Sequence, residues 1–196
     1  MHVKDYAFMM ESDDDLFLLG QIAGGDESAL RYLYLKYRPP LRRYFWYQLS
    51  HDAAQAEDLL QETFLSVWRA ARTVRHSGSV AAWIFQIAHR HVLQVRRHAS
   101  SRMDGHTFSL ELDDDRDASV ESPEDAIVMR IDLEHAMRQL SEKHREVLYL
   151  ICLQGFTIEE GAQILSVPPG TVKSRLSYAR QACLHVFAHP HVGEER

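Results

Sequence analysis

Apolar residues recur every three or four positions along most of this chain, which is the spacing of one face of an α-helix. No segment of useful length alternates apolar and polar residues as a half-buried β-strand does. The pattern therefore predicts an all-α fold. We expect two small helical domains joined by a flexible acidic linker.

Capping and helix-breaking residues divide the N-terminal half into separate helices. A Gly-Gly pair ends a first short helix, and Asp26 after it is a suitable N-cap for a second one. Pro39 and Pro40 predict a kink or break in this second helix, because proline lacks the backbone N–H. A third helix covers about 52–71, and a fourth covers about 81–97 after a short loop.

The C-terminal half follows a stretch with few large apolar residues, 103–121, which we interpret as the linker. Ser122 restarts the helical pattern as an N-cap. A capping box at Thr157 opens a short helix that ends near Leu165. A Pro-Pro-Gly turn comes next, and Thr171 is then a suitable cap for the last helix.

These elements group into two domains with tails. The expected boundaries are 1–15 for an acidic N-terminal tail, 16–102 for the first domain, 103–121 for the linker, 122–187 for the second domain and 188–196 for a C-terminal tail.

The net charge of −6 hides a strong separation of charge along the chain. Residues 69–102 hold seven arginines and no acid, whereas 104–125 hold nine acids and one arginine. A solvated surface rarely excludes one sign over so long a stretch. The first block therefore predicts a surface that faces a polyanion such as nucleic acid.

The composition argues against a membrane protein. The longest apolar run, 147–156, is about half of a spanning helix. The N-terminus lacks the basic start of a signal peptide. We expect a cytoplasmic protein with no membrane insertion.

Cysteine and histidine give little indication of redox or metal chemistry. Cys152 and Cys183 fall on apolar helix faces without a CxxC pair, so we expect buried, reduced thiols. Three histidines gather near the C-terminus, where tail composition is the favoured interpretation and weak metal binding stays open: His185, His189 and His191. We expect no metal and no cofactor.

The last helix separates an apolar stripe from a polar, basic face. Its stripe recurs at helical spacing and should pack inward: Val172, Leu176, Ala179, Cys183 and Val186. The other side carries groups that reach phosphates or base edges: Lys173, Ser174, Arg175, Ser177, Tyr178, Arg180 and Gln181. With the preceding capped helix, this predicts a helix-turn-helix whose second helix fits the major groove. An ordinary amphipathic surface helix is the alternative.

The third predicted helix has an unusual outward face. Its inward stripe leaves a leucine and a tryptophan outside among polar groups: Asp58, Gln61, Glu62, Leu65 and Trp68. Large apolar side chains set among polar ones are typical of protein-binding surfaces. A capped surface helix of the domain itself is the alternative.

Two motifs together resemble bacterial sigma factors of the extracytoplasmic-function (ECF) group, over about 16–187. DAAQAEDLLQETFLSVWRA, from Asp52, is similar to the region 2 segment that binds core RNA polymerase. LSEKHREVLYLICLQGFTIEEGAQILSVPPGTVKSRLSYAR, from Leu140, is similar to region 4, with REVL, G-x-T-x-E-E and V-P-x-G-T-V-K-S-R in order.

The resemblance implies a transcription initiation factor without catalysis of its own. It implies three kinds of partner: core RNA polymerase, through its β′ clamp helices and β flap; promoter DNA; and an inhibitory anti-sigma factor. The implied polymerase contacts are Asp58, Gln61, Glu62, Leu65 and Trp68. The implied contacts to the −10 element are Arg75, His76, Ser77, Trp83, Arg90, Gln94, Arg96 and Arg97, with Phe85 as a second aromatic surface for unstacked bases. Trp83 also lies on the apolar stripe of its helix, so core packing is its favoured interpretation. The implied contacts to the −35 element are Thr171, Lys173, Ser174, Arg175, Ser177, Tyr178 and Arg180.

The chain also departs from the family pattern. Its IAHRHVLQ segment has Arg90 where the family commonly has asparagine and Gln94 where it has aspartate. Gly161 replaces a larger apolar residue, and a glycine inside a helix costs about 1 kcal/mol relative to alanine. We therefore expect altered reading of the −10 element and a slightly shifted recognition helix.

Two other functions compete with an initiation factor. A stand-alone helix-turn-helix regulator would bind duplex DNA tightly without polymerase. An enzyme acting on nucleic acid would need a convergent set of acids and histidines, a metal-ligand spacing or a phosphate-binding loop, and the sequence shows none of them.

Overall fold

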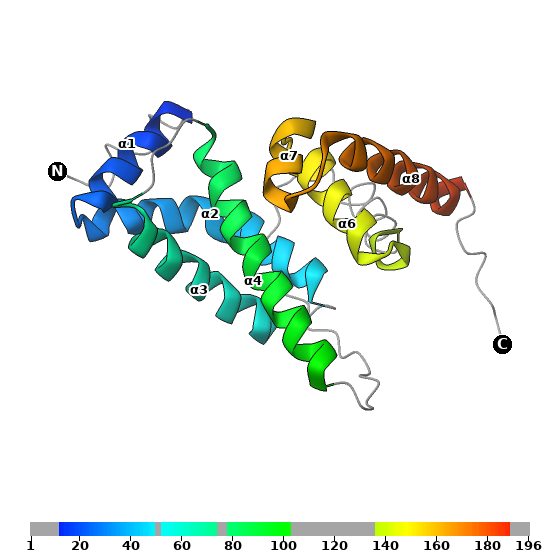
Figure 1. The fold of residues 1–196 in the computed structure, drawn as a ribbon, viewed down its shortest axis with the longest axis horizontal. Coiled ribbons are helices and arrows are strands. Elements are labelled where there is room, and N and C mark those ends of the chain that lie inside the picture. Colours follow the sequence, from blue (N-terminus) through cyan, green and yellow to red (C-terminus); the bar gives the residue numbers. More distant parts are fainter. Residues whose placement is uncertain (1–11, 50–51, 74–77, 103–135, 189–196) are drawn as a thin grey trace, which may run out of the picture.

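The computed structural model describes residues 12–49, 52–73, 78–102 and 136–188, and within them every regular element is helical (Figure 1). The all-α prediction is therefore confirmed. The predicted linker and the Ser122 cap lie outside the described residues. The elements in chain order are α1 (Ser12–Ala23), α2 (Glu27–Gln48), α3 (Ala53–Ala70), α4 (Val80–Arg102), α6 (Glu142–Leu148), η2 (Tyr149–Leu153), α7 (Ile158–Leu165) and α8 (Pro169–Ala188).

The predicted caps at the starts of α2, α3 and α7 are confirmed. The carboxylate of Asp26 accepts hydrogen bonds from the backbone N–H groups of Ser28 and Ala29. Asp52 does the same for Gln55. Thr157 and Glu160 form a reciprocal capping box at α7. Each cap satisfies N–H groups that have no partner within the helix.

Helix α2 is not broken at its two prolines. It runs from Glu27 to Gln48 with Pro39 and Pro40 inside. Of the expected kink or break, the break is therefore wrong. The prolines remove two donors, but Leu33 and Leu41 on either side of them are fully buried in the same core. Tertiary packing of one continuous apolar face therefore outweighs the lost helical hydrogen bonds.

Residues 12–15, which the sequence assigned to a tail, form the first turn of α1. Asp15 explains this, because its side chain is buried and bonded to α2. Its carboxylate accepts from Lys36 Nζ at 2.7 Å and from the Tyr37 hydroxyl at 2.5 Å. The two bonds attach α1 to α2.

The turn before α8 differs from the prediction that Thr171 caps the last helix. Helix α8 already begins at Pro169, and the Pro168 carbonyl accepts from the N–H groups of Thr171 and Val172. Proline is favoured in the first turn because its missing N–H would have no partner there. The reversal of the chain falls on Ser166, whose φ of 53° is left-handed.

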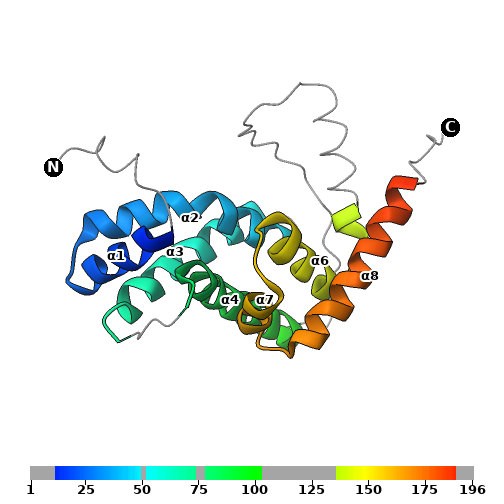
Figure 2. The ribbon, with the colours of Figure 1, turned by 90° about the horizontal axis from the view of Figure 1, so that it is seen from above.

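The two halves of the chain pack directly against each other. Helix α7 contacts α4, and α6 contacts α2. Figure 1 and Figure 2 show α6 and α7 lying between the four N-terminal helices and α8. The rings of Phe85 and Phe156 lie 5.1 Å apart across this boundary, and those of Tyr44 and Tyr149 lie 5.7 Å apart. The hydrophobic core is therefore continuous between the halves.

Candidate nucleic-acid and polymerase interfaces

Helix α8 presents its polar side outward. Its predicted inward residues are buried: Val172, Leu176, Ala179 and Cys183. Val186 and His185 belong to the last turn, whose side chains lie outside the description. The outward side, called the α8 face below, has exposed Lys173, Ser174, Ser177, Tyr178, Arg180 and Gln181, with Thr171 and Arg175 half-buried at its edges. All seven predicted −35 residues thus lie on one accessible side of one helix.

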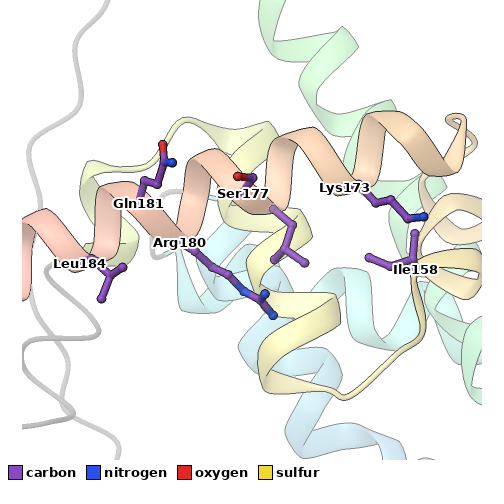
Figure 3. A pocket seen from close by; sticks show the side chains of 7 residues that line it. Ile158, Lys173, Ser177, Arg180, Gln181 and Leu184 are labelled. Atoms are coloured by element: carbon purple, nitrogen blue, oxygen red, sulfur yellow. The ribbon is translucent and has the colours of Figure 1, made fainter.

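An open groove of about 410 Å³ runs along this face (Figure 3). Its apolar lining comes from Ile158 of α7 and from Leu176 and Leu184 of α8. Lys173 and Arg180 stand at its edges. The groove therefore combines apolar contact area with two cations, a combination suited to a nucleic-acid backbone with its adjoining base edges.

Tyr178 is held in place by a residue that sequence reasoning missed. The His144 ring of α6 stacks on it with centroids 4.3 Å apart and planes 26° from parallel. His144 Nδ1 is also hydrogen-bonded to Ser141 Oγ at 2.9 Å. Burial, and then the charge of Arg175, lower the pKa of His144, which favours a neutral ring. No local pattern relates these residues, because they come from separate helices.

The expectation of two buried thiols is half wrong. Cys183 is buried, and burial raises the pKa of its thiol. Cys152 is exposed, with Arg180 Nη2 3.6 Å from its sulfur atom. The difference arises in η2, a π-helical turn that replaces the expected regular helix and shifts which residues face inward.

Helix α3 exposes the face expected to bind protein. Asp58, Gln61, Glu62 and Leu65 are exposed, with Leu65 at 54%. Trp68 is half-buried and packs against the core. We call these five residues the α3 face.

A histidine of α4 supports the α3 face from behind. His91 Nε2 lies 3.2 Å from Ser66 Oγ, and its Nδ1 lies 3.5 Å from the Glu62 carboxylate. Burial lowers the pKa of His91, with Glu62 opposing and Arg90 adding to the shift. His89, two positions earlier, points the other way and is buried.

The arginine-rich stretch 69–102 contains exposed residues and residues that contact other parts of the chain. Arg90, Gln94 and Arg97 are exposed on α4, and Trp83 is half-buried against the core. The other three predicted −10 residues of the preceding loop lie outside the described residues: Arg75, His76 and Ser77.

Two residues of this block are engaged within the chain. Arg96 donates to the side-chain oxygen of Gln48 at 2.6 Å, and its Nε lies 3.3 Å from the Glu142 carboxylate. Phe85 is only 1% exposed and packs on Phe156. In this arrangement it offers no platform for a base, contrary to the expectation from sequence.

Over the described residues, no group of three or more His, Cys, Asp or Glu side chains could hold a metal ion. Within the same ranges, no helix combines the length and apolar character needed to cross a membrane.

A short capped helix, a tight turn and a longer helix with an exposed basic side, next to a helical bundle, have the arrangement of a helix-turn-helix transcription factor. Residues 16–188 match the family model described as ECF sigma factor. The chain belongs to this family. It is an alternative sigma factor, which directs RNA polymerase to promoters.

Several known proteins are similar to this chain. The ECF RNA polymerase sigma factor SigL of Mycobacterium tuberculosis is 33% identical over 161 residues, which cover 82% of this chain and 89% of SigL. The RNA polymerase sigma-H factor of Pseudomonas aeruginosa is 29% identical over 182 residues, 89% of this chain and 94% of that protein.

Solved structures show the same fold. The sigma factor RpoE of Bartonella quintana, in complex with the anti-sigma factor NepR, matches with a TM-score of 0.66 and 27% identity over 82% of this chain and 98% of RpoE. CnrH, in complex with the cytosolic domain of CnrY, matches with a TM-score of 0.65 and 19% identity over 90% of this chain and 99% of CnrH.

Proposed function

We propose that this sigma factor binds core RNA polymerase through the α3 face, opens the −10 element with α4 and the loop before it, and reads the −35 element with α8. The observation that carries the proposal is the division of α8 into a buried apolar stripe and an accessible polar face. The protein acts in the cytoplasm and has no catalytic site of its own, because its role is to position the polymerase.

The α8 face supports major-groove reading by both charge and geometry. Lys173 and Arg180 supply cations for phosphates, and the hydroxyls of Ser174 and Ser177 can contact phosphate or base edges. Tyr178 is fixed by His144, so it loses little side-chain freedom when DNA binds. The helix of 20 residues is about 30 Å long, enough to lie in the groove with a turn to spare.

The α3 face supports a contact with the clamp helices of the β′ subunit. Its exposed Leu65 and half-buried Trp68 provide apolar area, and Asp58, Gln61 and Glu62 provide polar groups on the preceding turns of the helix. Exposed apolar area next to polar groups is typical of protein interfaces.

Reading of the −10 element should differ from the family pattern. Arg90 and Gln94 are both exposed on α4, where asparagine and aspartate are common. An arginine favours guanine or phosphate and a glutamine favours adenine. We therefore propose that the −10 sequence is chosen by these two residues.

We also propose that an anti-sigma factor regulates the chain. The support is that RpoE of Bartonella quintana, similar over 82% of this chain, was solved bound to such a factor.

The test is transcription by purified bacterial core polymerase on a pool of genomic fragments, with and without this protein, followed by sequencing of transcript 5′ ends. New starts that share two upstream elements are expected. Polymerase binding without new starts would overturn the assignment of −10 reading to α4. Tight duplex binding without polymerase would favour a stand-alone regulator.

A further inference from the structure

We propose that His144 of α6 is a further DNA-contacting residue, which forms with Arg175 and Tyr178 of α8 a binding site for one phosphodiester of the promoter and takes up a proton when DNA binds. We call these three side chains the α6–α8 corner. The proposal rests on the assignment of α8 to the −35 element. It adds a contact from outside the recognition helix, and the strength of this contact depends on pH.

The side chains of the α6–α8 corner lie together on the accessible side of the molecule. Arg175 and Tyr178 are three positions apart on α8, so they are neighbours on the helix surface. The His144 ring stacks on the Tyr178 ring with centroids 4.3 Å apart, and Arg175 is near enough for its charge to act on His144. Tyr178 is 58% exposed, and the other two are half-buried. A ligand in solvent can therefore reach all three.

A hydrogen bond determines which nitrogen atom of His144 is available. Nδ1 lies 2.9 Å from Oγ of Ser141, at the start of the same helix. Ser141 is in the N-cap position of α6, but its hydroxyl makes no capping hydrogen bond and serves the ring instead. Within the ranges that the structure describes, Nε2 has no hydrogen-bond partner. Because the serine hydroxyl can donate to Nδ1, Nε2 is the atom that carries the proton of the neutral ring and can donate to a ligand.

The α6–α8 corner has donors and positive charge but no acceptor of its own. Among the described residues, no carboxylate pairs with Arg175 or His144, and the Tyr178 hydroxyl has no hydrogen-bond partner. A DNA phosphate supplies what is missing, because it brings negative charge and several acceptor oxygens. Such backbone contacts make up half or more of the hydrogen bonds between proteins and DNA.

The other charged groups of α6 do not replace this ligand. Glu142 is paired with Arg96 of α4, at 3.3 Å. Arg145 donates to backbone carbonyls. Lys143 is exposed and adds positive charge at the same end of α6. The surroundings of His144 therefore favour a bound anion over an internal ion pair.

Binding of a phosphate should raise the pKa of His144. In the free protein, burial and then the charge of Arg175 hold this pKa below the ordinary value of 6.5, so the ring is neutral at neutral pH. A nearby negative charge favours the imidazolium form. Between the two pKa values the complex therefore binds more protons than the free protein. Affinity for DNA should rise as the pH falls through this interval.

The first test measures binding of holoenzyme to a fluorescent promoter duplex by anisotropy from about pH 8 to about pH 6. The duplex is a fragment selected in the transcription test or, for a stand-alone regulator, by binding of the free chain. His144→Phe keeps a ring against Tyr178 but has no nitrogen atoms in it, and His144→Gln keeps a donor without the titration. The advantage of the wild type over either variant should grow about fivefold towards pH 6, since each pKa unit gained on binding corresponds to about tenfold in affinity.

Lys143→Ala, at the exposed neighbour of His144, is the matched control and should keep the pH dependence of the wild type. Far-UV circular dichroism checks that all variants are folded. If His144 only supports the Tyr178 ring, His144→Phe should follow the pH profile of the wild type, and this result would overturn the proposal.

The second test identifies the phosphate. Single methylphosphonate substitutions, each of which removes the charge of one phosphate, are placed in turn along both strands of the −35 element. At about pH 6, one position should weaken binding of the wild type but not of His144→Phe. The slope of log affinity against log salt concentration should be smaller in magnitude by up to about 0.9 for this variant. If no position distinguishes the two proteins, the phosphate site is overturned.

Lys173→Ala on the same duplex separates this proposal from the proposed function. Weaker binding of Lys173→Ala, together with parallel pH profiles for the wild type and both His144 variants, would overturn the α6–α8 corner alone. Unchanged binding of Lys173→Ala and of the His144 variants would show that α8 does not contact the DNA, and would overturn both.

Discussion

The side chain of Ile151 occupies the space in which a Cβ atom on residue 161 would lie. Its Cδ1 atom is 2.8 Å from that position, closer than real Cβ contacts come. Gly161 is therefore matched to an isoleucine on the preceding π-helical turn. Gly161, which departs from the family pattern, thus makes room for Ile151 and does not only lower the stability of α7.

A double-mutant cycle tests this match. Gly161→Ala alone should change the free energy of unfolding little, because the helix-propensity gain of about 1 kcal/mol is offset by displacement of the isoleucine methyl. Ile151→Val removes that methyl at a cost of about 0.5–1.5 kcal/mol. In the Ile151→Val background, the alanine should then stabilise by about 1 kcal/mol. Urea unfolding of the four proteins measures the coupling, and strictly additive effects would show that the two sites are independent.

The phosphate contact proposed for Lys173 predicts a change in salt dependence. Each neutralised phosphate contributes about 0.9 to the slope of log affinity against log salt concentration. Lys173→Ala should therefore reduce the magnitude of that slope by about one for holoenzyme on a promoter duplex. Fluorescence anisotropy over a salt series measures it. Lys143→Ala, at an exposed lysine of α6 without a proposed DNA role, should leave the slope unchanged; an equal reduction in both variants would remove the special role of Lys173.

Substitutions on the α3 face and on the α8 face should affect different steps of initiation. Arg175→Ala should lower initiation at −35-dependent promoters by about 5- to 150-fold, as expected for a lost base or phosphate contact, while polymerase binding stays intact. Asp58→Ala combined with Gln61→Ala should instead weaken polymerase binding, by about tenfold if these residues lie in the interface core. Binding to immobilised core polymerase and run-off transcription measure the two effects. Equal weakening of polymerase binding in both variants would show that the assignment of faces is wrong.

Local features of the sequence predicted much of this fold. The caps at Asp26, Asp52 and Thr157 act on N–H groups two or three positions away, so the information lies within one turn of chain. The periodic stripe of α8 likewise predicted which residues are buried, because 3.6 residues per turn determine the face.

Features set by distant contacts were not predictable. The continuity of α2 through its prolines depends on packing against other helices, and local rules favour a kink or break there. Glu146 and Tyr44 are 102 positions apart, and neither carries a local sign of its partner. The same contact between the halves buries Phe85, which the sequence alone assigned to DNA.

The buried cluster of Tyr44, His89 and Glu146 also predicts a specific dependence of stability on pH. Burial alone would raise the pKa of Glu146, but the hydrogen bond and charge of His89 from α4, the Tyr44 hydroxyl from α2 and the charge of Arg96 outweigh it. The folded-state pKa therefore lies below the ordinary value of 4.5. Between these two values the unfolded chain binds more protons than the folded one. The stabilisation is thus complete above about pH 4.5 and is lost as the pH falls through the folded pKa.

Glu146→Gln removes this titration while nearly keeping the side-chain shape. The free energy of unfolding of the wild-type protein should fall more steeply with acidification below about pH 4.5 than that of the variant, by up to about 1.4 kcal/mol per pH unit for one proton. Urea unfolding at intervals between about pH 3 and pH 6 gives both curves, and Glu159→Gln is the matched control because that glutamate is exposed. The control should follow the wild type. Parallel curves for wild type and Glu146→Gln would mean that the carboxylate is not held in its ionised form by Tyr44 and His89, and that the two halves are joined chiefly by their apolar contacts.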